Sequence, residues 1–360
     1  MIKNKIAIIG TAGIPAKYGG FETLVEYLTQ KLSQRTSITV YCSSISYKNK
    51  LDNYNGVNLK YIPLRANGIQ SILYDIISLF LAAKQHDKIL ILGVSGCVVL
   101  PLFRFFYQQK KIIINIDGLE HRRVKWNKYI RAFLKYSEKV AVQYADDIIT
   151  DNEAIKNYVL DEYDKKSNLI AYGGDQADII PLTKDTKNKY SIPDNYAFLV
   201  CRIEPENNVH LILEAFFNLQ KPLVIIGNWD QNSYGKKLYY QYKTSKNIIL
   251  VNAIYDQSIL NQIRSNCSIY IHGHSAGGTN PSLVEAMWCS LPIIAFDVSF
   301  NRKTTENSAI YFKDSQELVS IIKDTSREEL KNNARCMKEI ANRKYTWSII
   351  TEKYFELLND

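Results

Sequence analysis

The sequence predicts an α/β protein of two domains, each built on a parallel sheet with crossover helices. Its 360 residues exceed the length at which a single core usually stops growing. Short β-rich apolar runs alternate with helical-period segments from one end to the other, which is typical of such sheets. Open parallel sheets bind ligands beyond the carboxyl ends of their strands, so we expect a site in a cleft between two Rossmann-like domains.

The first domain, residues 1–175, contains six predicted strands, at 5–10, 37–44, 58–64, 87–93, 111–117 and 147–151. Its first helix follows the Gly19-Gly20 pair, because apolar residues recur there at steps of three and four from Phe21 to Leu32. A polar stretch from Asp175 to Asn195, with two prolines, predicts the domain boundary.

The second domain, residues 196–340, contains five predicted strands, at 196–203, 223–228, 247–254, 268–273 and 292–297. The remaining residues, 341–360, predict a C-terminal helix that could pack back on the first domain.

Composition points to a cytoplasmic protein. The six cysteines are far apart and form no CxxC pair or metal-ligand spacing, as expected of reduced thiols. Gly10 and Gly13 interrupt the N-terminal apolar run, which therefore does not resemble a signal peptide. A net charge of +9 favours an acidic partner such as a phospholipid surface or a phosphorylated substrate. No RNA-binding motif accompanies that charge, so we expect no nucleic-acid partner.

The segment from Tyr270 to Met287 carries the most chemistry. A predicted strand ends, a Gly277-Gly278-Thr279-Asn280 loop follows, and a helix begins with Asn280 as N-cap and Pro281 in its first turn. Backbone N–H groups of such a loop, with the positive end of a helix behind them, bind anions. Glu285 lies about one turn inside the helix and could reach ribose hydroxyls, although a plain turn with a surface glutamate fits the local pattern equally well.

This segment resembles the donor-binding signature of the retaining glycosyltransferases related to glycogen and sucrose synthases, which have the two-domain GT-B fold. The resemblance implies that Glu285 binds the nucleotide ribose. The first glutamate of the family signature falls on Gly277, so His272, His274 and Asn280 are the candidates to hold the donor sugar in its place.

Three further segments resemble the donor site of the same family. The stretch from Val200 to His210 resembles the strand and turn that clamp the donor diphosphate; Arg202 matches the family arginine, and Asn207 occupies the lysine position. Gly227-Asn228-Trp229 resembles the turn after the next strand. Leu250 to Ile254, with Asn252 at its centre, resembles the segment along the base.

The opening of the chain, Gly10 to Thr23, resembles that of bacterial capsule and cell-wall rhamnosyltransferases within this superfamily, as does Asp117-Gly-Leu-Glu120. The resemblance places Gly19 and Gly20 near the donor phosphate, and Tyr18, Asp117 and Glu120 near the acceptor. Asp117, at the end of a strand, is expected to orient the acceptor hydroxyl or take its proton, and Glu22 is a further catalytic candidate. Asp117 as a helix cap and Glu22 as a complement to a helix N-terminus are the structural alternatives.

Residues 122–139 carry seven Lys or Arg and one Glu, with apolar residues near helical spacing. A basic amphipathic helix of this kind can lie on an anionic membrane, and a packed helix with a solvated basic face is the alternative.

The family resemblance implies transfer of L-rhamnose from dTDP-rhamnose to a lipid diphosphate-linked saccharide, with retention of configuration and without a cofactor or metal. His272 and His274 lack the further ligands of a zinc site. The alternatives are a UDP-hexose donor, a nucleotide-sugar epimerase, and a non-enzymatic nucleotide- or polyanion-binding module.

Overall fold

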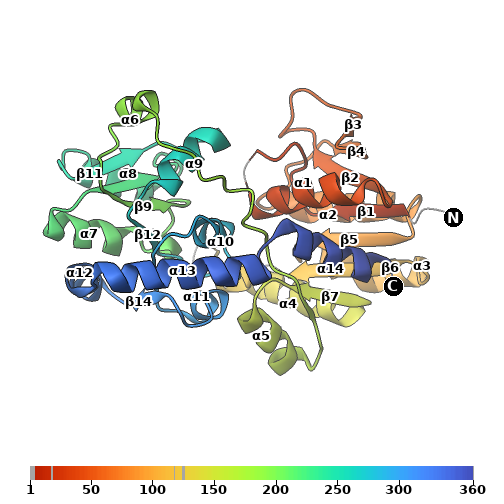
Figure 1. Ribbon diagram of the computed structural model, residues 1–360. Coiled ribbons are helices and arrows are strands. Elements are labelled where there is room, and N and C mark those ends of the chain that lie inside the picture. The colour runs from red at the N-terminus through yellow and green to blue at the C-terminus, as the bar shows by residue number, and fades with distance from the viewer. Residues whose placement is uncertain (1–4, 18, 117, 124–125, 360) are drawn as a thin grey trace. The chain divides into compact units, whose positions relative to one another are not determined.

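The computed structural model describes residues 5–17, 19–116, 118–123 and 126–359 and divides the chain into two units (Figure 1). Unit 1 comprises residues 1–171 and 347–360, and unit 2 comprises residues 172–346. Each unit has its own sheet and is described by itself.

Unit 1 is built on an eight-stranded sheet of order β3-β4-β2-β1-β5-β6-β7-β8, in which only β3 is antiparallel to its neighbour. Its strands are β1 (Lys5–Ile9), β2 (Ser37–Ser43), β3 (Asn53–Tyr54), β4 (Val57–Ile62), β5 (Lys88–Leu92), β6 (Lys111–Ile116), β7 (Asp147–Thr150) and β8 (Asn168–Leu169). Its α-helices are α1 (Gly20–Leu32), α2 (Gln70–Ala83), α3 (Leu100–Phe106), α4 (Lys128–Tyr144), α5 (Glu153–Tyr163) and α14 (Trp347–Asn359). Short 3₁₀ turns, η1 (Cys97–Val99) and η2 (Glu120–Arg122), precede α3 and α4.

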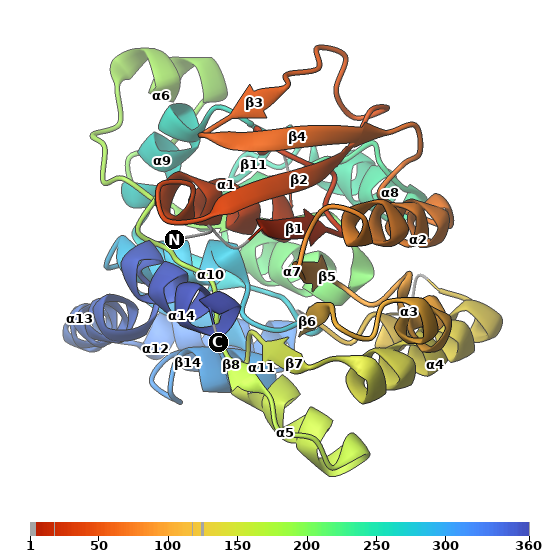
Figure 2. The ribbon, with the colours of Figure 1, turned by 90° about the vertical axis from the view of Figure 1, so that its right-hand side faces the viewer.

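Helices cover both faces of this sheet, so its central strands are buried almost completely and consist of continuous apolar runs. On one face α14 packs against α1, where the rings of Tyr27 and Trp347 stack 4.6 Å apart and Arg35 pairs with Glu352 at 2.7 Å. Figure 2 shows α2, α3 and α4 on the opposite face.

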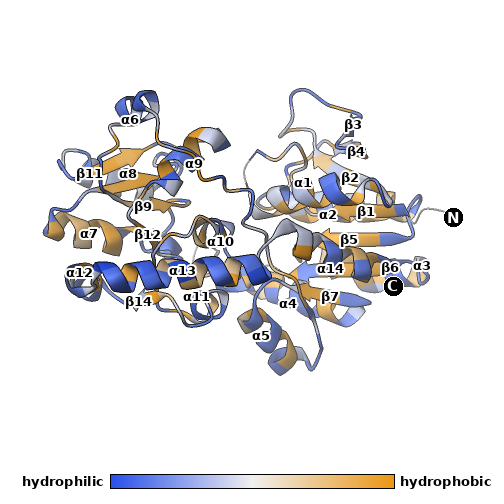
Figure 3. Cartoon of the chain, viewed as in Figure 1, coloured by the Kyte–Doolittle hydropathy of each residue, from blue (hydrophilic) through white to orange (hydrophobic). Residues whose placement is uncertain are grey.

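Unit 2 is built on a six-stranded parallel sheet of order β11-β10-β9-β12-β13-β14. Its strands are β9 (Ala197–Val200), β10 (Leu223–Ile226), β11 (Ile248–Val251), β12 (Ile269–His272), β13 (Ile293–Phe296) and β14 (Ile310–Phe312). Its α-helices are α6 (Lys184–Tyr190), α7 (Val209–Leu219), α8 (Ser233–Tyr242), α9 (Gln257–Ser265), α10 (Pro281–Trp288), α11 (Ser299–Thr304), α12 (Ser315–Asp324) and α13 (Arg327–Lys344), and η3 (Pro205–Asn207) is a 3₁₀ turn. Its strands are apolar, whereas α13 is largely hydrophilic (Figure 3).

The polar stretch predicted as the domain boundary, Asp175 to Asn195, is part of unit 2. Thr183 Oγ1 donates a 2.9 Å hydrogen bond to Gln262 Oε1 of α9, and Ile180 N donates to Ser265 Oγ at 3.2 Å. Just before it, Gly174 N donates to Tyr345 O at 2.8 Å. The chain therefore enters unit 2 after Ala171, before the polar stretch begins, and it returns to unit 1 after Thr346.

The predicted α/β class with two parallel sheets is confirmed. Every strand predicted from an apolar run is present, and α1 begins at Gly20 with Leu24, Val25, Leu28 and Leu32 buried. The short strands β3, β8 and β14 were not predicted. Among the described residues, no helix is both long and apolar enough to span a bilayer.

Candidate functional site in the second unit

The loops that follow β9, β10 and β12 pack tightly together at the carboxyl edge of the second sheet. A Cβ on Gly273 would lie 2.1 Å from Asn207 O, and a Cβ on Gly227 would lie 2.5 Å from Ile203 Cδ1, so neither position has room for a side chain. Asn208 Nδ2 donates to Gly273 O at 2.9 Å and fastens the first loop to the third. The edge is therefore a rigid frame for the residues that project from it.

Arg202 projects from this frame immediately after β9. Its side chain is 36% exposed, and its Nε lies 3.9 Å from Glu204 Oε2, too far for a hydrogen bond. Most of the guanidinium donors are therefore available to an anion.

Asn207 was expected to contact the donor at the position of the family lysine, but its side chain points into the protein. Its side chain is buried and Nδ2 donates to Arg202 O at 2.6 Å. The amide closes the turn that carries Arg202, so it contributes through positioning rather than by charge.

The glycine-rich loop after β12 opens onto free space. Gly277 has φ +118°, and nothing lies within 4 Å of a Cβ built on it, whereas Gly278 and Thr279 are buried. Asn280 occupies the N-cap position of α10, but its side chain makes no capping hydrogen bond, contrary to the expected cap. The open space lies where the first glutamate of the family signature would project.

Glu285, one turn into α10, is held from two sides within unit 2. Arg264 Nη2 lies 2.6 Å from its Oε2, and Gln176 Nε2 donates to its Oε1 at 2.7 Å. Arg264 is itself buried and donates a second bond to Asn261 Oδ1 at 2.9 Å. A carboxylate has about four acceptor positions, so Glu285 retains capacity for further hydroxyl donors in a fixed orientation.

His272 and His274 stack on each other at the end of β12, with ring centroids 4.5 Å apart. His272 is fully buried, and burial lowers its pKa to about 3. Its ring is consequently neutral at physiological pH and cannot bind an anion as a cation. The expected sugar contact from His272 is corrected to a supporting position beneath His274, which is the more exposed ring.

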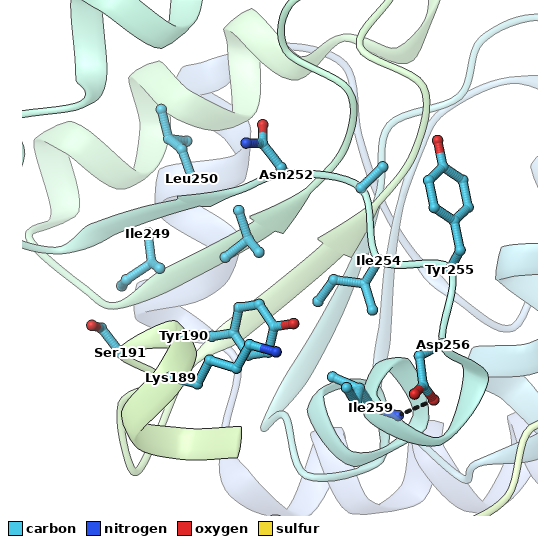
Figure 4. A pocket seen from close by; sticks show the side chains of 12 residues that line it. Lys189, Tyr190, Ser191, Ile249, Leu250, Asn252, Ile254, Tyr255, Asp256 and Ile259 are labelled. Atoms are coloured by element: carbon cyan, nitrogen blue, oxygen red, sulfur yellow. Dashed lines mark hydrogen bonds between the residues drawn. The ribbon is translucent and has the colours of Figure 1, made fainter. Parts of the chain in front are cut away.

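A hollow of about 700 Å³ lies beside the carboxyl end of β11 and is lined by the end of α6, by residues 249–256 and by Ile259 (Figure 4). Asn252 and Tyr255 are among its lining residues, together with Tyr190 and Lys189 of α6. Trp229 Nε1 donates to Val251 O at 3.0 Å and anchors the end of the strand. The segment expected to lie along a base thus borders this space.

In unit 1, Glu22 fixes the loop between β1 and α1. Its Oε1 accepts hydrogen bonds from Thr11 Oγ1 at 3.0 Å and from Ala12 N at 2.7 Å. A Cβ on Gly19 would lie 1.9 Å from Glu22 Oε2, and Gly19 has φ +137°, so only glycine fits there. Gly20 begins α1. These contacts show that Glu22 shapes the loop, and its catalytic role stays a prediction.

The expected acceptor residues lie after β6. Tyr18 and Asp117 fall outside the described residues. Glu120 pairs with Arg123 Nε at 2.7 Å and accepts from Trp126 Nε1 at 3.1 Å, so its carboxylate holds the turn.

A buried network that the sequence did not reveal supports this turn. Glu138 of α4 is buried and accepts hydrogen bonds from His121 Nδ1 at 3.0 Å, Tyr158 Oη at 2.6 Å and Tyr163 Oη at 2.6 Å. Burial alone would raise the pKa of Glu138, but the three hydrogen bonds outweigh it and the pKa is lowered. The carboxylate therefore stays ionised, which fixes the position of His121.

The basic segment is not one continuous helix, because η2 ends at Arg122 and α4 begins only at Lys128. Several of its charges have partners within unit 1. Arg122 lies over the Tyr158 ring at 4.8 Å, and Lys135 pairs with Glu162 at 2.8 Å. Lys125 lies outside the described residues.

Comparison with known proteins bears on both units. Residues 183–343 match the family described as Glycosyl transferases group 1, and residues 3–175 match a domain of unknown function, DUF1972. Among curated proteins, none matches the chain. Neither family match spans half of the chain.

Solved structures of similar fold cover nearly the whole chain. They include sucrose-phosphate synthase from Thermosynechococcus elongatus, at 16% identity and a TM-score of 0.81, which covers 99% of this chain and 98% of that one. HepE from Anabaena has 14% sequence identity and a TM-score of 0.72, and the match covers 99% of both chains. The starch synthase IV catalytic domain from Arabidopsis thaliana has 13% sequence identity and a TM-score of 0.73, and the match also covers 99% of both chains.

These similarities show a GT-B fold of two α/β units. Within that fold, residues 183–343 of unit 2 match a glycosyltransferase family.

Proposed function

We propose that the chain transfers L-rhamnose from dTDP-rhamnose to a lipid diphosphate-linked saccharide, with retention of configuration and without a metal ion. The main support for a nucleotide-sugar donor is the arrangement of residues at the carboxyl edge of the second sheet. There an accessible arginine, Arg202, and an open glycine-rich loop at a helix N-terminus project from one tightly packed frame.

This edge suits the stabilisation of a leaving diphosphate. As the bond from the sugar C1 to the phosphate oxygen breaks, negative charge builds on the diphosphate. The Arg202 guanidinium and the backbone N–H groups around Gly277 and Gly278 are donors fixed before the reaction, and such groups supply a large part of many rate enhancements. The acceptor oxygen forms the new bond to C1, and its proton goes to Asp117 or to the departing phosphate oxygen.

The nucleoside has two candidate contacts in unit 2. The remaining acceptor positions of Glu285 are suited to ribose hydroxyls, since Arg264 and Gln176 hold the carboxylate in place. The hollow beside β11 is suited to the base. The structures of HepE with UDP and of starch synthase IV with ADP and acarbose support a nucleotide ligand in this fold.

Rhamnose as the sugar rests on the resemblance of the segment from Gly10 to Thr23 and of Asp117 to Glu120. A UDP-hexose is the second candidate donor, because HepE has been solved with UDP and glucose. The acceptor is assigned to unit 1, near Tyr18, Asp117 and Glu120, at the cytoplasmic face of the membrane.

The nucleotide is tested by titrating the protein with dTDP, UDP and ADP in a calorimeter. We expect dTDP to bind at least about tenfold more tightly than ADP, a difference of roughly 1.4 kcal/mol. Preferential binding of UDP would support the UDP-hexose alternative, and no binding of any of the three would contradict a nucleotide-sugar donor. The anomeric configuration of the product, read by NMR, tests retention separately.

A further inference from the structure

Helix α2 of unit 1 exposes an unusually apolar face. Ile69, just before the helix, is 74% exposed, Leu73 is 56% exposed, and Ile77 and Leu81 are exposed as well. These residues recur every four positions and therefore lie along one side of the helix. The only Asp, Glu, Lys, Arg or His within α2 is Asp75, which is buried on the inner side.

Helix α3 continues this apolar face. Phe105 is 74% exposed, Phe106 is 61% exposed, and Leu102 is also exposed. The two helices are in contact, since the Phe80 ring of α2 packs against Phe103 of α3 with centroids 5.6 Å apart. Figure 2 shows α2 and α3 following one another down the same face of the sheet. We call the exposed residues Ile69, Leu73, Ile77, Leu81, Leu102, Phe105 and Phe106 the apolar surface.

Cations outnumber carboxylates around the apolar surface, and Asp146 beside α3 is paired with Arg104 at 2.6 Å. Exposed Arg65 and Lys84 flank α2, and exposed Lys128 and Lys139 lie on α4, which contacts α3. Between residues 63 and 110 the only acidic residues are Asp75 and Asp87. Asp75 is buried, and Asp87 pairs with Lys110 at 3.5 Å.

Helix α4, which contacts α3, also exposes two tyrosines. Tyr129 and Tyr136 of α4 are both exposed. Aromatic side chains with a polar end are favoured at membrane–water interfaces, and Lys or Arg beside them attract anionic headgroups.

We infer that unit 1 docks on an anionic lipid bilayer with the apolar surface inserted among the headgroups and acyl chains. Helix α2, with 14 residues, is too short to span the bilayer and would lie in the plane of the interface. A second copy of the chain is the poorer occupant, because a twofold contact through this surface would bring the flanking cations of both copies together.

This inference rests on the proposed function in one respect, since a lipid-linked acceptor gives the docked unit its substrate. It differs from the expectation from sequence, which assigned membrane contact to residues 122–139 alone. Several of those charges have partners within the unit, and the apolar contribution comes instead from α2 and α3.

The test is co-sedimentation of the full chain with vesicles of phosphatidylcholine containing phosphatidylglycerol, in the absence of donor and acceptor. The variant Leu73→Ser/Ile77→Ser/Phe105→Ser/Phe106→Ser removes apolar groups that are already exposed, so folding should be retained. We expect its partitioning to fall by at least about tenfold. The control Leu160→Ser/Ile179→Ser changes two exposed apolar residues outside the apolar surface and should bind as the parent does.

Each alternative outcome overturns the inference. Absence of parent binding to the vesicles would do so, as would equal binding of the fourfold variant. A parent dimer in sedimentation velocity that the fourfold variant dissociates, without vesicle binding, would assign the apolar surface to a second copy. Because no sugar is transferred in this assay, the result is independent of the donor titration, and failure of one does not imply failure of the other.

Discussion

Arg202 holds an accessible positive charge at the point where the strands of unit 2 end, with its closest carboxylate 3.9 Å away. We expect Arg202→Ala to reduce the rate of sugar transfer by about 10²-fold or more, because a charge-assisted contact to the leaving diphosphate is lost. Steady-state turnover of the donor measures this.

Arg335→Ala is the matched control for this variant, since Arg335 is an exposed arginine on α13. It should leave turnover unchanged. Equal rates for the parent and Arg202→Ala would contradict the assignment of Arg202 to the diphosphate.

Glu285 has both a proposed ligand and an internal partner, so its substitution should have two effects. Glu285→Gln removes the charged acceptor for ribose hydroxyls and also leaves buried Arg264 without its carboxylate. Breaking a buried pair by changing one partner costs about 3–5 kcal/mol. We therefore expect weaker nucleotide binding together with a lower melting temperature, measured by calorimetry and thermal unfolding.

The double variant Glu285→Gln/Arg264→Gln separates the two effects. Replacing both charges should restore part of the stability without restoring nucleotide affinity. Recovery of affinity along with stability would show that Glu285 has only a structural role.

Some side-chain contacts in unit 2 do not follow from the local sequence. Nothing in the local sequence relates Glu285 to Arg264 or to Gln176, which lies 109 positions away and meets it only through the tertiary fold. Asn207 could be located by motif, but the direction of its amide depends on the turn that it closes.

At the scale of elements, the network around Glu138 joins α4 and α5 to the turn after β6. Hydrogen bonds lower the pKa of Glu138 despite its burial. Because this folded-state pKa lies below the unfolded-state value of about 4.3, the stabilisation is complete above about pH 4.3 and is lost as the pH falls through the folded-state pKa.

Glu138→Gln should accordingly lower the free energy of unfolding by about 1–3 kcal/mol at pH 7, with a smaller difference at pH 3.5. Urea unfolding at the two pH values measures the change. Glu162→Gln, which alters an exposed carboxylate near the same network, should have little effect at either pH. A Glu138→Gln deficit that grows on acidification would contradict the direction of this pKa shift.

Strands and helices were predictable where burial on both faces requires a long apolar run. The interior strands β1, β5, β6, β9 and β12 are of this kind. Strands β3 and β8 have two residues each, too few for a pattern, and β14 has three. The segment predicted as the domain boundary is polar because it faces solvent, whereas its hydrogen bonds to α9 tie it to unit 2.

The whole molecule combines a GT-B fold with a glycosyltransferase family match in unit 2, and we propose that the transfer needs no metal. Among the described residues, no three His, Cys, Asp or Glu side chains are grouped as metal ligands. We expect activity to survive EDTA, since Arg202 and loop N–H groups serve the diphosphate. Loss of activity in EDTA that added Mg²⁺ reverses would contradict this.

Transfer of labelled sugar from a nucleotide-sugar donor to a lipid tests the proposed reaction. The protein is incubated with radiolabelled dTDP-rhamnose, UDP-glucose or UDP-galactose, with and without a lipid diphosphate-linked saccharide, and the lipid fraction is counted. We predict label in the lipid only with dTDP-rhamnose and acceptor together, and a loss of about 10²-fold or more for Arg202→Ala. Transfer from a UDP-sugar instead would replace the donor assignment, and no transfer from any donor would contradict the proposed reaction.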